Sequence, residues 1–451
     1  MTYLTVPFFT YIFAVLPVWL PLLAVDLAAL YILLFRERFD PRTFVFWVAI
    51  VFILPFAGFI LYLMFGCTLF MRSDGSRKHA SDRKYMAGVQ SDTPDGDTRL
   101  SRILSESGAD IYTSGNDVRL HWDMGADGRD FLSIIETAER TIHLEIFGLP
   151  RDKALVQALE RKARDGLEVR LITSVVGFGR TPGLHALRSA GVRHATFHSG
   201  LNSLFMIKTA NRCLREILVV DGDHALTGLG AGIEIKGPAA ARLDRRFIAD
   251  WEHASGEVCD IVDYDGGPKG GCGVQCVSSG PDSPGLPMLH GYSELISGAR
   301  QRLYVTFPYL VPTDDMYNAV KQAAIAGTDV RILIPAKCRH WYQAWNSLAA
   351  SNPLMMSGVR VYFAPKALVK CLAVADGKVC AVGSGIFNSR SMRADYGENV
   401  VVFSEDAAGD AEREFLSELE DATECLPEEY SRRSFTDMLK IAVSRMFMFF
   451  N

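Results

Sequence analysis

Two short stretches of this chain share one design, and they constrain the fold more than any other feature. LREILVVD occupies residues 214–221 and VKCLAVAD occupies residues 369–376, and a glycine-containing turn follows each of them. An apolar run that ends in Asp-Gly predicts a buried strand that stops at a tight turn. Because the design occurs twice, the sequence indicates a duplicated unit.

Matching elements precede both stretches. The first copy has the strand-like TIHLEIF, the helix-like DKALVQALERKARDG and the strand-like VRLITS, and the second copy has RLYVTFP, DDMYNAVKQAAIAG and VRILIP. Strands that alternate with helices of this length predict an α/β fold, with a parallel or mixed sheet covered by helices. We therefore expect two α/β halves, at residues 99–265 and 266–430, that face one another as an internal pseudo-dimer.

The N-terminal part of the chain carries two apolar runs, at residues 11–35 and 43–67. Each is close to the ~20 residues that a helix needs to cross a bilayer. The sequence predicts a transmembrane hairpin in residues 1–70, followed by a polar linker at 71–98. Asp26 is the ionisable residue deep in a run, and we expect it to turn toward the partner helix.

Basic residues favour one orientation for this hairpin. Three arginines occupy the connector, and five cations follow the second run: Arg72, Arg77, Lys78, Arg83 and Lys84. By the positive-inside rule, the main domain is expected in the cytoplasm of a protein held in the inner membrane by two helices.

Charge and cysteine content exclude two classes of partner. The net charge is −5, whereas a nucleic-acid binder usually has a strong basic excess, so no nucleic-acid partner is predicted. The nine cysteines lack paired metal-site spacing and read as reduced thiols, so we predict no metal and no cofactor.

The aspartate-terminated stretches resemble the HxKxxxxD signature of the phospholipase D superfamily, which is followed by GGxN or GSxN. Five further segments are similar to parts of bacterial cardiolipin synthases: ILPFAGFILYLMFG at 53–66, RRFIADWEHASGE at 245–257, SSGPDSP at 278–284, TFPYLVP at 306–312 and GSGIFNSRSM at 383–392. The resemblance implies a duplicated phospholipase D fold. It also implies a reaction in which one motif histidine attacks lipid phosphorus and the other protonates the leaving alcohol.

The catalytic residues of that signature are replaced in this chain. The aspartates of both motifs remain, whereas the histidine, lysine and asparagine positions have changed. The eight equivalent positions are Leu214, Glu216, Asp221 and Ala231 in the first copy, and Val369, Cys371, Asp376 and Ile386 in the second. No catalytic set is intact, because leucine and valine can neither attack phosphorus nor donate a proton.

Glu216 also reverses the charge that the family uses to hold phosphate. Two unit charges ~4 Å apart interact by roughly 4 kcal/mol at an effective dielectric constant of about 20, so a carboxylate repels the phosphodiester that a lysine would attract. Strand alternation turns Arg215 and Lys370 to the other face. A one-residue slip that brought them inward would invert every apolar residue of each strand.

We therefore predict a catalytically inactive, cardiolipin synthase-like pseudoenzyme that binds anionic membrane phospholipid. It would regulate an active cardiolipin synthase or associate with itself. The alternative is an active phosphatidyltransferase that uses non-standard residues, with Cys371 as nucleophile and Glu216 as base.

The C-terminal tail, at residues 431–451, alternates apolar and basic residues at helical spacing. This pattern predicts a helix that lies on an anionic leaflet. Packing of the same helix on the soluble domain is the alternative.

Overall fold

The computed structural model of this protein divides into two compact units, a smaller one that contains the described residues up to 74 and a larger one that contains those from 75 onward. The structure describes residues 24–36, 41–54, 56–65, 69–86, 98–122, 124, 129–149, 153–174, 183–197, 213–261, 264, 266–366, 370–428 and 433–446.

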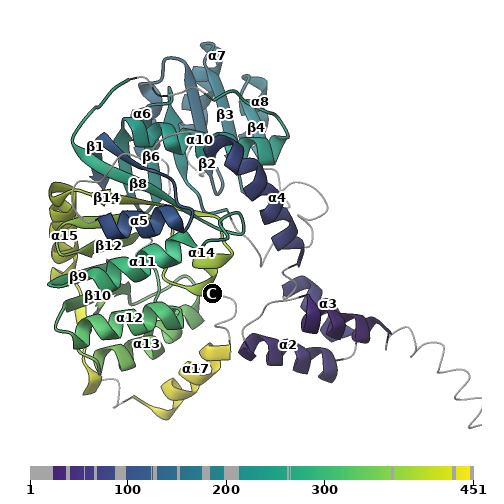
Figure 1. Cartoon of the computed structure of the whole chain (residues 1–451), viewed down its shortest axis with the longest axis vertical. Helices are drawn as coiled ribbons and strands as arrows, with labels where there is room; N and C mark the ends of the chain where they lie inside the picture. Colours follow the sequence, from purple (N-terminus) through teal and green to yellow (C-terminus); the bar gives the residue numbers. More distant parts are fainter. Residues whose placement is uncertain are drawn as a thin grey trace, which may run out of the picture. The chain divides into compact units, whose positions relative to one another are not determined.

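The larger unit is built on one sheet of fifteen strands (Figure 1). The first half contributes β1 (Tyr112–His121), β2 (Thr141–Ile146), β3 (Glu168–Thr173), β4 (Arg193–Thr196), β5 (Ile217–Val220), β6 (His224–Leu229) and β7 (Ala231–Lys236). The second half contributes β8 (Cys272–Ser279), β9 (Arg302–Thr306), β10 (Asp329–Pro335), β11 (Arg360–Ala364), β12 (Cys371–Ala375), β13 (Val379–Gly383), β14 (Gly397–Phe403) and the edge strand β15 (Thr423–Cys425).

Strand order repeats between the two halves. The first half runs β4-β3-β2-β5-β6-β7-β1 and the second runs β11-β10-β9-β12-β13-β14-β8, and β1 pairs with β8 to join them. In each half three strands are parallel and the others antiparallel. Short turns join β5 to β6, β6 to β7 and β12 to β13, whereas the connection from β13 to β14 contains α14. The predicted α/β class with a mixed sheet is confirmed.

Helices cover the sheet in each half. The first half has α6 (Arg129–Glu136), α7 (Lys153–Arg164), α8 (Leu184–Ser189) and the long α10 (Pro238–Ser255). The second half has α11 (Pro287–Gly298), α12 (Asp314–Ile325), α13 (Trp341–Met355), the short α14 (Ser389–Arg393) and the long α15 (Glu405–Glu420), and α5 (Thr98–Glu106) packs on α11. Figure 1 shows α11, α12 and α13 layered over the strands of the second half.

The motif strands alternate between two cores, as their sequences require. Ile217 and Val219 of β5 pack in one cluster with Leu372 and Val374 of β12, together with α10 and α15. Leu218 of β5 instead packs in the cluster that α6 and α7 cover. The strand register is therefore the one that the apolar pattern predicts.

The smaller unit contains a helical segment at 24–35, α2 (Pro41–Ile53) and α3 (Ala57–Phe65). The predicted second span at 43–67 is thus two helices, and the Asp26 carboxylate accepts a hydrogen bond from the Phe56 backbone N–H at the break, 2.9 Å away. Asp26 turns to the neighbouring helix, as predicted. Within the ranges that the structure describes, each helix is too short or too polar to cross a membrane.

Much of the first predicted span lies outside the described residues, because 11–23 fall there. The transmembrane hairpin therefore stays a prediction. Apolar side chains on the outside of this unit, such as Phe35, Phe52 and Ile53, are more than two-thirds exposed.

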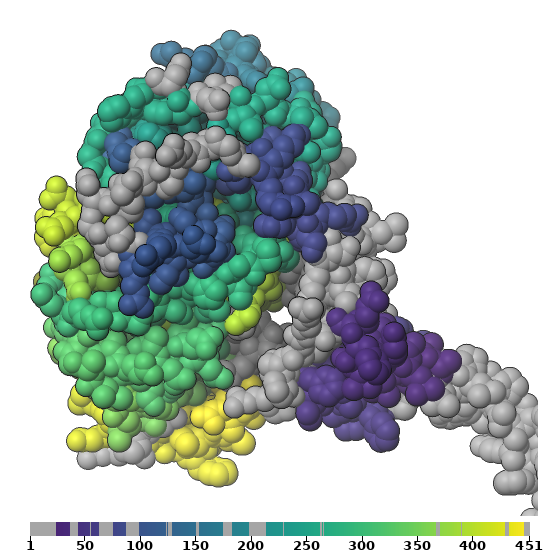
Figure 2. Space-filling view, in the orientation of Figure 1, coloured from purple at the N-terminus to yellow at the C-terminus, as the bar shows by residue number. Residues whose placement is uncertain are grey.

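Residues 71–98 were predicted to be a polar linker, and that prediction is wrong for its first part. α4 (Leu69–Met86) occupies it, and its residues from 75 onward pack on the larger unit. Figure 2 shows α4 against the surface of the first half. Lys78 and Asp82 of this helix form ion pairs with the core of the larger unit. One side of α4 is therefore buried, although its sequence is polar.

At the C-terminus, α17 (Phe435–Met446) packs along α13. Ile441 is buried, and the Ser444 hydroxyl donates to the Asn346 side-chain oxygen over 2.9 Å. The opposite face exposes Phe435 and Leu439. The alternative of packing on the domain is confirmed for this helix, and contact with an anionic leaflet stays a prediction for its exposed face.

Candidate functional site

The two motif aspartates hold equivalent positions in the two halves. Asp221 and Asp376 adopt left-handed backbone conformations, with φ of 53° and 54°. The Asp221 carboxylate accepts from three consecutive backbone N–H groups at 139–141, and the Asp376 carboxylate from three at 300–302. Each aspartate therefore ties the end of its strand to the start of the neighbouring one, the turn-forming role predicted for it.

Glu216, at the first lysine position, is a partly buried carboxylate just before β5. Desolvation raises its pKa to about 7. No ion pair to Glu216 occurs among the residues described, so the side chain is about half charged at neutral pH. Leu214 beside it donates its backbone N–H to the Tyr396 carbonyl, 2.7 Å away, which places the first motif next to the segment that leads into β14.

Arg215 forms ion pairs with two buried carboxylates. Its guanidinium is fully buried and binds Asp250 of α10 at 2.9 Å and Asp282 at 3.1 Å. Lys370 in the second half is likewise buried and binds Glu418 of α15 at 2.6 Å. The middle cation of each motif thus pairs with the long helix of its own half, which leaves neither cation available to hold a substrate phosphate.

The second motif is apolar where the structure describes it. Cys371 is fully buried, and desolvation raises the pKa of its thiol well above the usual range. Ile386 packs against the same core cluster as Cys371. Val369 lies outside the described residues. A thiol in such surroundings is a poor source of thiolate, which is the nucleophilic form.

The structure brings some of the predicted positions together and separates others. Cys371 and Ile386 share one core, whereas Ala231 is buried in the cluster that contains Ile217. At the motif positions themselves, the hydrogen bond from the Leu214 N–H to the Tyr396 carbonyl is one of the contacts that join the two halves.

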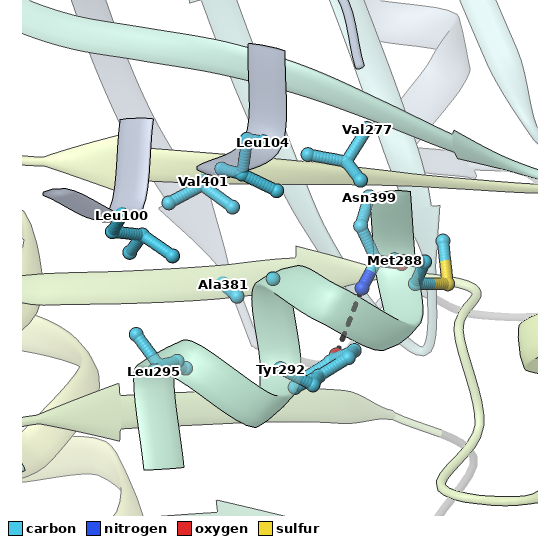
Figure 3. Close-up of a pocket in the computed structure, with 10 residues that line it drawn as sticks. Leu100, Leu104, Val277, Met288, Tyr292, Leu295, Ala381, Asn399 and Val401 are labelled. Carbon is cyan, nitrogen blue, oxygen red and sulfur yellow. Dashed lines mark hydrogen bonds between the residues drawn. The ribbon is translucent and has the colours of Figure 1, made fainter. Parts of the chain in front are cut away.

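A small cavity of about 20 Å³ lies between helices α5 and α11 and strands β8, β13 and β14 (Figure 3). Its lining is apolar except for the polar ends of Asn399 and Tyr292. The Asn399 amide donates to the Tyr292 hydroxyl over 2.8 Å and accepts from the Gly385 N–H, also over 2.8 Å. The cavity has room for about one water molecule, not for a lipid chain.

Sequence reasoning missed the charged groups behind the first motif. Lys78, Asp82 and Arg246 join Arg215, Asp250 and Asp282 in one buried cluster. The GPDS segment at 280–283 was read for its resemblance alone, and the (i, i+4) pair of α4 looks like an ordinary solvated pair.

Glu234 lies away from this cluster, on β7. It accepts hydrogen bonds from His121 at 2.9 Å and from His224 at 2.8 Å. Although burial raises its pKa, these two imidazoles hold the pKa below its ordinary value. Glu234 thus connects β7 to β1 and β6 through side-chain hydrogen bonds.

Comparison with known proteins agrees with this architecture. Residues 292–419 match the family described as "Cardiolipin synthase, PLD-like domain", and residues 24–66 match "Phospholipase_D-nuclease N-terminal". A cardiolipin synthase of Clostridium perfringens is 28% identical, over 91% of this chain and 94% of its own length. The major cardiolipin synthase ClsA of Bacillus subtilis is also 28% identical, over 92% and 95%.

A phosphatidylserine synthase of Haemophilus influenzae has a similar structure, with a TM-score of 0.55 over 78% of this chain and 100% of that one. At 9% identity the likeness concerns the fold alone. Two like α/β halves, each with an aspartate-capped motif strand, define the phospholipase D class of fold. The matched family models and these relatives make the chain similar to the cardiolipin synthases of the phospholipase D superfamily.

Proposed function

We propose that this chain is a membrane-anchored, cardiolipin synthase-like protein that binds anionic phospholipid without catalysing phosphatidyl transfer. Its role would be to regulate an active synthase or to assemble with copies of itself, with the larger unit in the cytoplasm. The proposal rests on the chemistry at the motif positions. Leucine, glutamate, valine and cysteine stand where two histidines and two lysines would act.

Burial at these positions supports the proposal. Cys371, the strongest nucleophile among them, is sealed in an apolar core with a raised thiol pKa. The nearby cations, Arg215 and Lys370, are held by carboxylates. A phosphodiester that entered the site would meet Glu216, which is partly ionised at neutral pH and which pairs with no cation in the part of the chain that the structure describes.

The second candidate is an active cardiolipin synthase. The relatives carry that name, and their similarity extends over more than nine-tenths of this chain. Glu216 would then be the general base, since a carboxyl group with a pKa of about 7 suits proton transfer at neutral pH. The reaction would join two phosphatidylglycerols and release glycerol.

One experiment separates these candidates. The purified full-length protein is incubated with phosphatidylglycerol vesicles, and cardiolipin and glycerol are measured against a heat-inactivated control. We expect no product above that control, but binding to phosphatidylglycerol vesicles in preference to phosphatidylcholine vesicles. Cardiolipin formation that Glu216→Gln abolishes and Asp223→Asn preserves would establish the active synthase. Equal binding to both vesicles would remove the proposed lipid preference.

A further inference from the structure

The docked part of α4 presents a polar face to the larger unit. Its buried positions are Gly75, Lys78, Asp82 and Tyr85, whose spacing of three, four and three residues places them on one side of a helix. A helix that packs permanently on a core usually buries an apolar stripe at this spacing. Here the central two positions of the stripe are charged.

Close backbone packing and hydrogen bonds set the position of this face. A Cβ at Gly75 would lie 2.4 Å from the Cβ of Pro281, so α4 approaches the 280–286 loop with no room for a side chain. The Tyr85 hydroxyl donates to Glu252 of α10, and Arg245 of α10 donates to the Tyr85 carbonyl over 3.2 Å. The helix is thus placed against the loop at one end and against α10 at the other.

Ion pairs cross between α4 and the core at the two charged positions. The Lys78 ammonium lies 2.6 Å from Asp250 and 2.9 Å from Asp282, and the Asp82 carboxylate lies 2.8 Å from Arg246. Arg215 of the first motif binds the same two aspartates as Lys78. α4 therefore shares its partners with the residue between Leu214 and Glu216.

The charges balance on each side separately. Lys78 and Asp82 are 2.8 Å apart on α4 and neutralise one another. Arg215 and Arg246 balance Asp250 and Asp282 on the core side, and contacts among these four remain if α4 leaves. The Glu398 carboxyl group also lies 3.9 Å from the Arg215 guanidinium, and burial raises its pKa to about 7, so it adds only a partial negative charge at neutral pH. Burying an unpaired charge is what makes a broken ion pair costly. After separation, each of these six residues (Lys78 and Asp82 on α4, and the four on the core side) still has a partner of opposite charge on its own side.

We propose that α4 is a releasable ionic clamp, formed by Gly75, Lys78, Asp82 and Tyr85, that couples the segment following the N-terminal apolar helices to the first motif strand. Docking of the clamp holds Asp250 and Asp282 in place around Arg215. Release would loosen the residues around 214–216 without unfolding the sheet. The second half offers a built-in comparison. The acidic partners of Lys370 lie on α15, its ammonium also donates to the Trp122 carbonyl, and α4 plays no part in these contacts.

Hydrogen exchange of the full-length protein, measured by mass spectrometry in detergent micelles, tests the clamp. The double variant Lys78→Asp/Asp82→Lys keeps the composition, the net charge and the pair within α4, but turns each ion pair with the core into a repulsion. Exchange in residues 75–86 should accelerate by roughly tenfold or more, because local opening no longer breaks favourable contacts. Residues 213–221 should also accelerate, whereas residues 370–376 should not. Arg83→Ala, on the exposed face of α4, is the matched control and should behave as the wild type does.

The wild-type protein supplies an independent measurement that needs no variant. In increasing urea, exchange in 75–86 should follow a local opening with a weaker urea dependence than exchange in β10. If both segments share one urea dependence, α4 opens only with global unfolding and the clamp is refuted. Unchanged protection of 75–86 in the swapped variant would also refute it, as would loss of protection in β10 together with α4.

Discussion

Replacing Arg215 by methionine should test how far the buried cluster holds the two halves together. The Arg215 guanidinium forms two hydrogen bonds to Asp250, at 3.0 and 2.9 Å, and contacts Asp282 at 3.1 Å. It also donates to the Ser279 carbonyl of the second half. Methionine has a similar length but no charge, so the variant leaves one carboxylate of the cluster without compensation.

The expected loss is large. Removing one partner of a buried ion pair typically costs roughly 3–5 kcal/mol of unfolding free energy, mainly because a charge is left buried and unpaired. Although burial raises the pKa of Asp250, Arg215 and Lys78 hold it below its ordinary value. The loss should therefore be present at pH 7, where Asp250 is charged.

Urea unfolding of the full-length protein, followed by tryptophan fluorescence, measures this loss, and a double-mutant cycle assigns its cause. Asp250→Asn removes the charge that Arg215→Met leaves unpaired, so the double variant should lose at least about 1 kcal/mol less than the sum of the single losses. Arg215→Lys, which keeps the charge but not the two-pronged contact, should lose less than Arg215→Met. A loss below about 1 kcal/mol for Arg215→Met, or strictly additive losses in the cycle, would refute the reasoning.

Three further predictions concern single positions. Because burial raises the pKa of Glu216 to about 7 in the folded state, its contribution to stability is present at pH 4 and is lost as the pH rises through 7. Glu216→Gln should raise the melting temperature at pH 8 and leave it unchanged at pH 4. Although burial raises the pKa of Asp376, the backbone N–H of Arg302 and its neighbours hold it below its ordinary value, so this carboxylate stabilises the fold at neutral pH. The stability lost in Asp376→Ala, about 1–3 kcal/mol at pH 7, should shrink as the pH falls below about 4, and a pH-independent loss would contradict the assignment. Ile441→Ala should lower the unfolding free energy by roughly 2–4 kcal/mol, because Ile441 is buried on the face of α17 that packs along α13. Leu439→Ala, on the exposed face of the same helix, should change it by less than about 0.5 kcal/mol, and equal losses would show that α17 does not pack as described.

The sequence predicts the fold well where its signals are local. Asp-Gly at 221–222 and at 376–377 predicts where two strands end, and β5 and β12 do end at Val220 and Ala375. The alternating apolar residues of β5 predict which side chains share a core. Each signal lies within a few residues of the feature that it predicts, so local propensity and burial point to the same structure.

The clamp could not be predicted in this way. Lys78 and Asp82 form an (i, i+4) pair that is typical of a solvated helix, and their partners Asp250 and Asp282 lie far away in the sequence. The break between α2 and α3 could not be predicted for the same reason. The Asp26 carboxylate that binds the Phe56 N–H at this break lies on another helix, 30 residues away in the sequence. A polar contact between residues far apart in the sequence produces no periodic pattern of residue types, whereas burial of one apolar face does.

The seam between β1 and β8 limits how this chain can be divided. Tyr112 pairs with Gln275 and Thr113 with Val274. Each half therefore supplies hydrogen-bond partners to the backbone of the strand at the edge of the other half, β1 or β8. A fragment that stopped near residue 265 would present β1 with its ladder groups open to water, and the complementary fragment would present β8. Unpaired strands of this kind recruit other chains. Expressed separately, the halves should therefore aggregate or swap partners, and co-expression should recover a soluble pair, which makes the seam a condition for solubility as much as for shape.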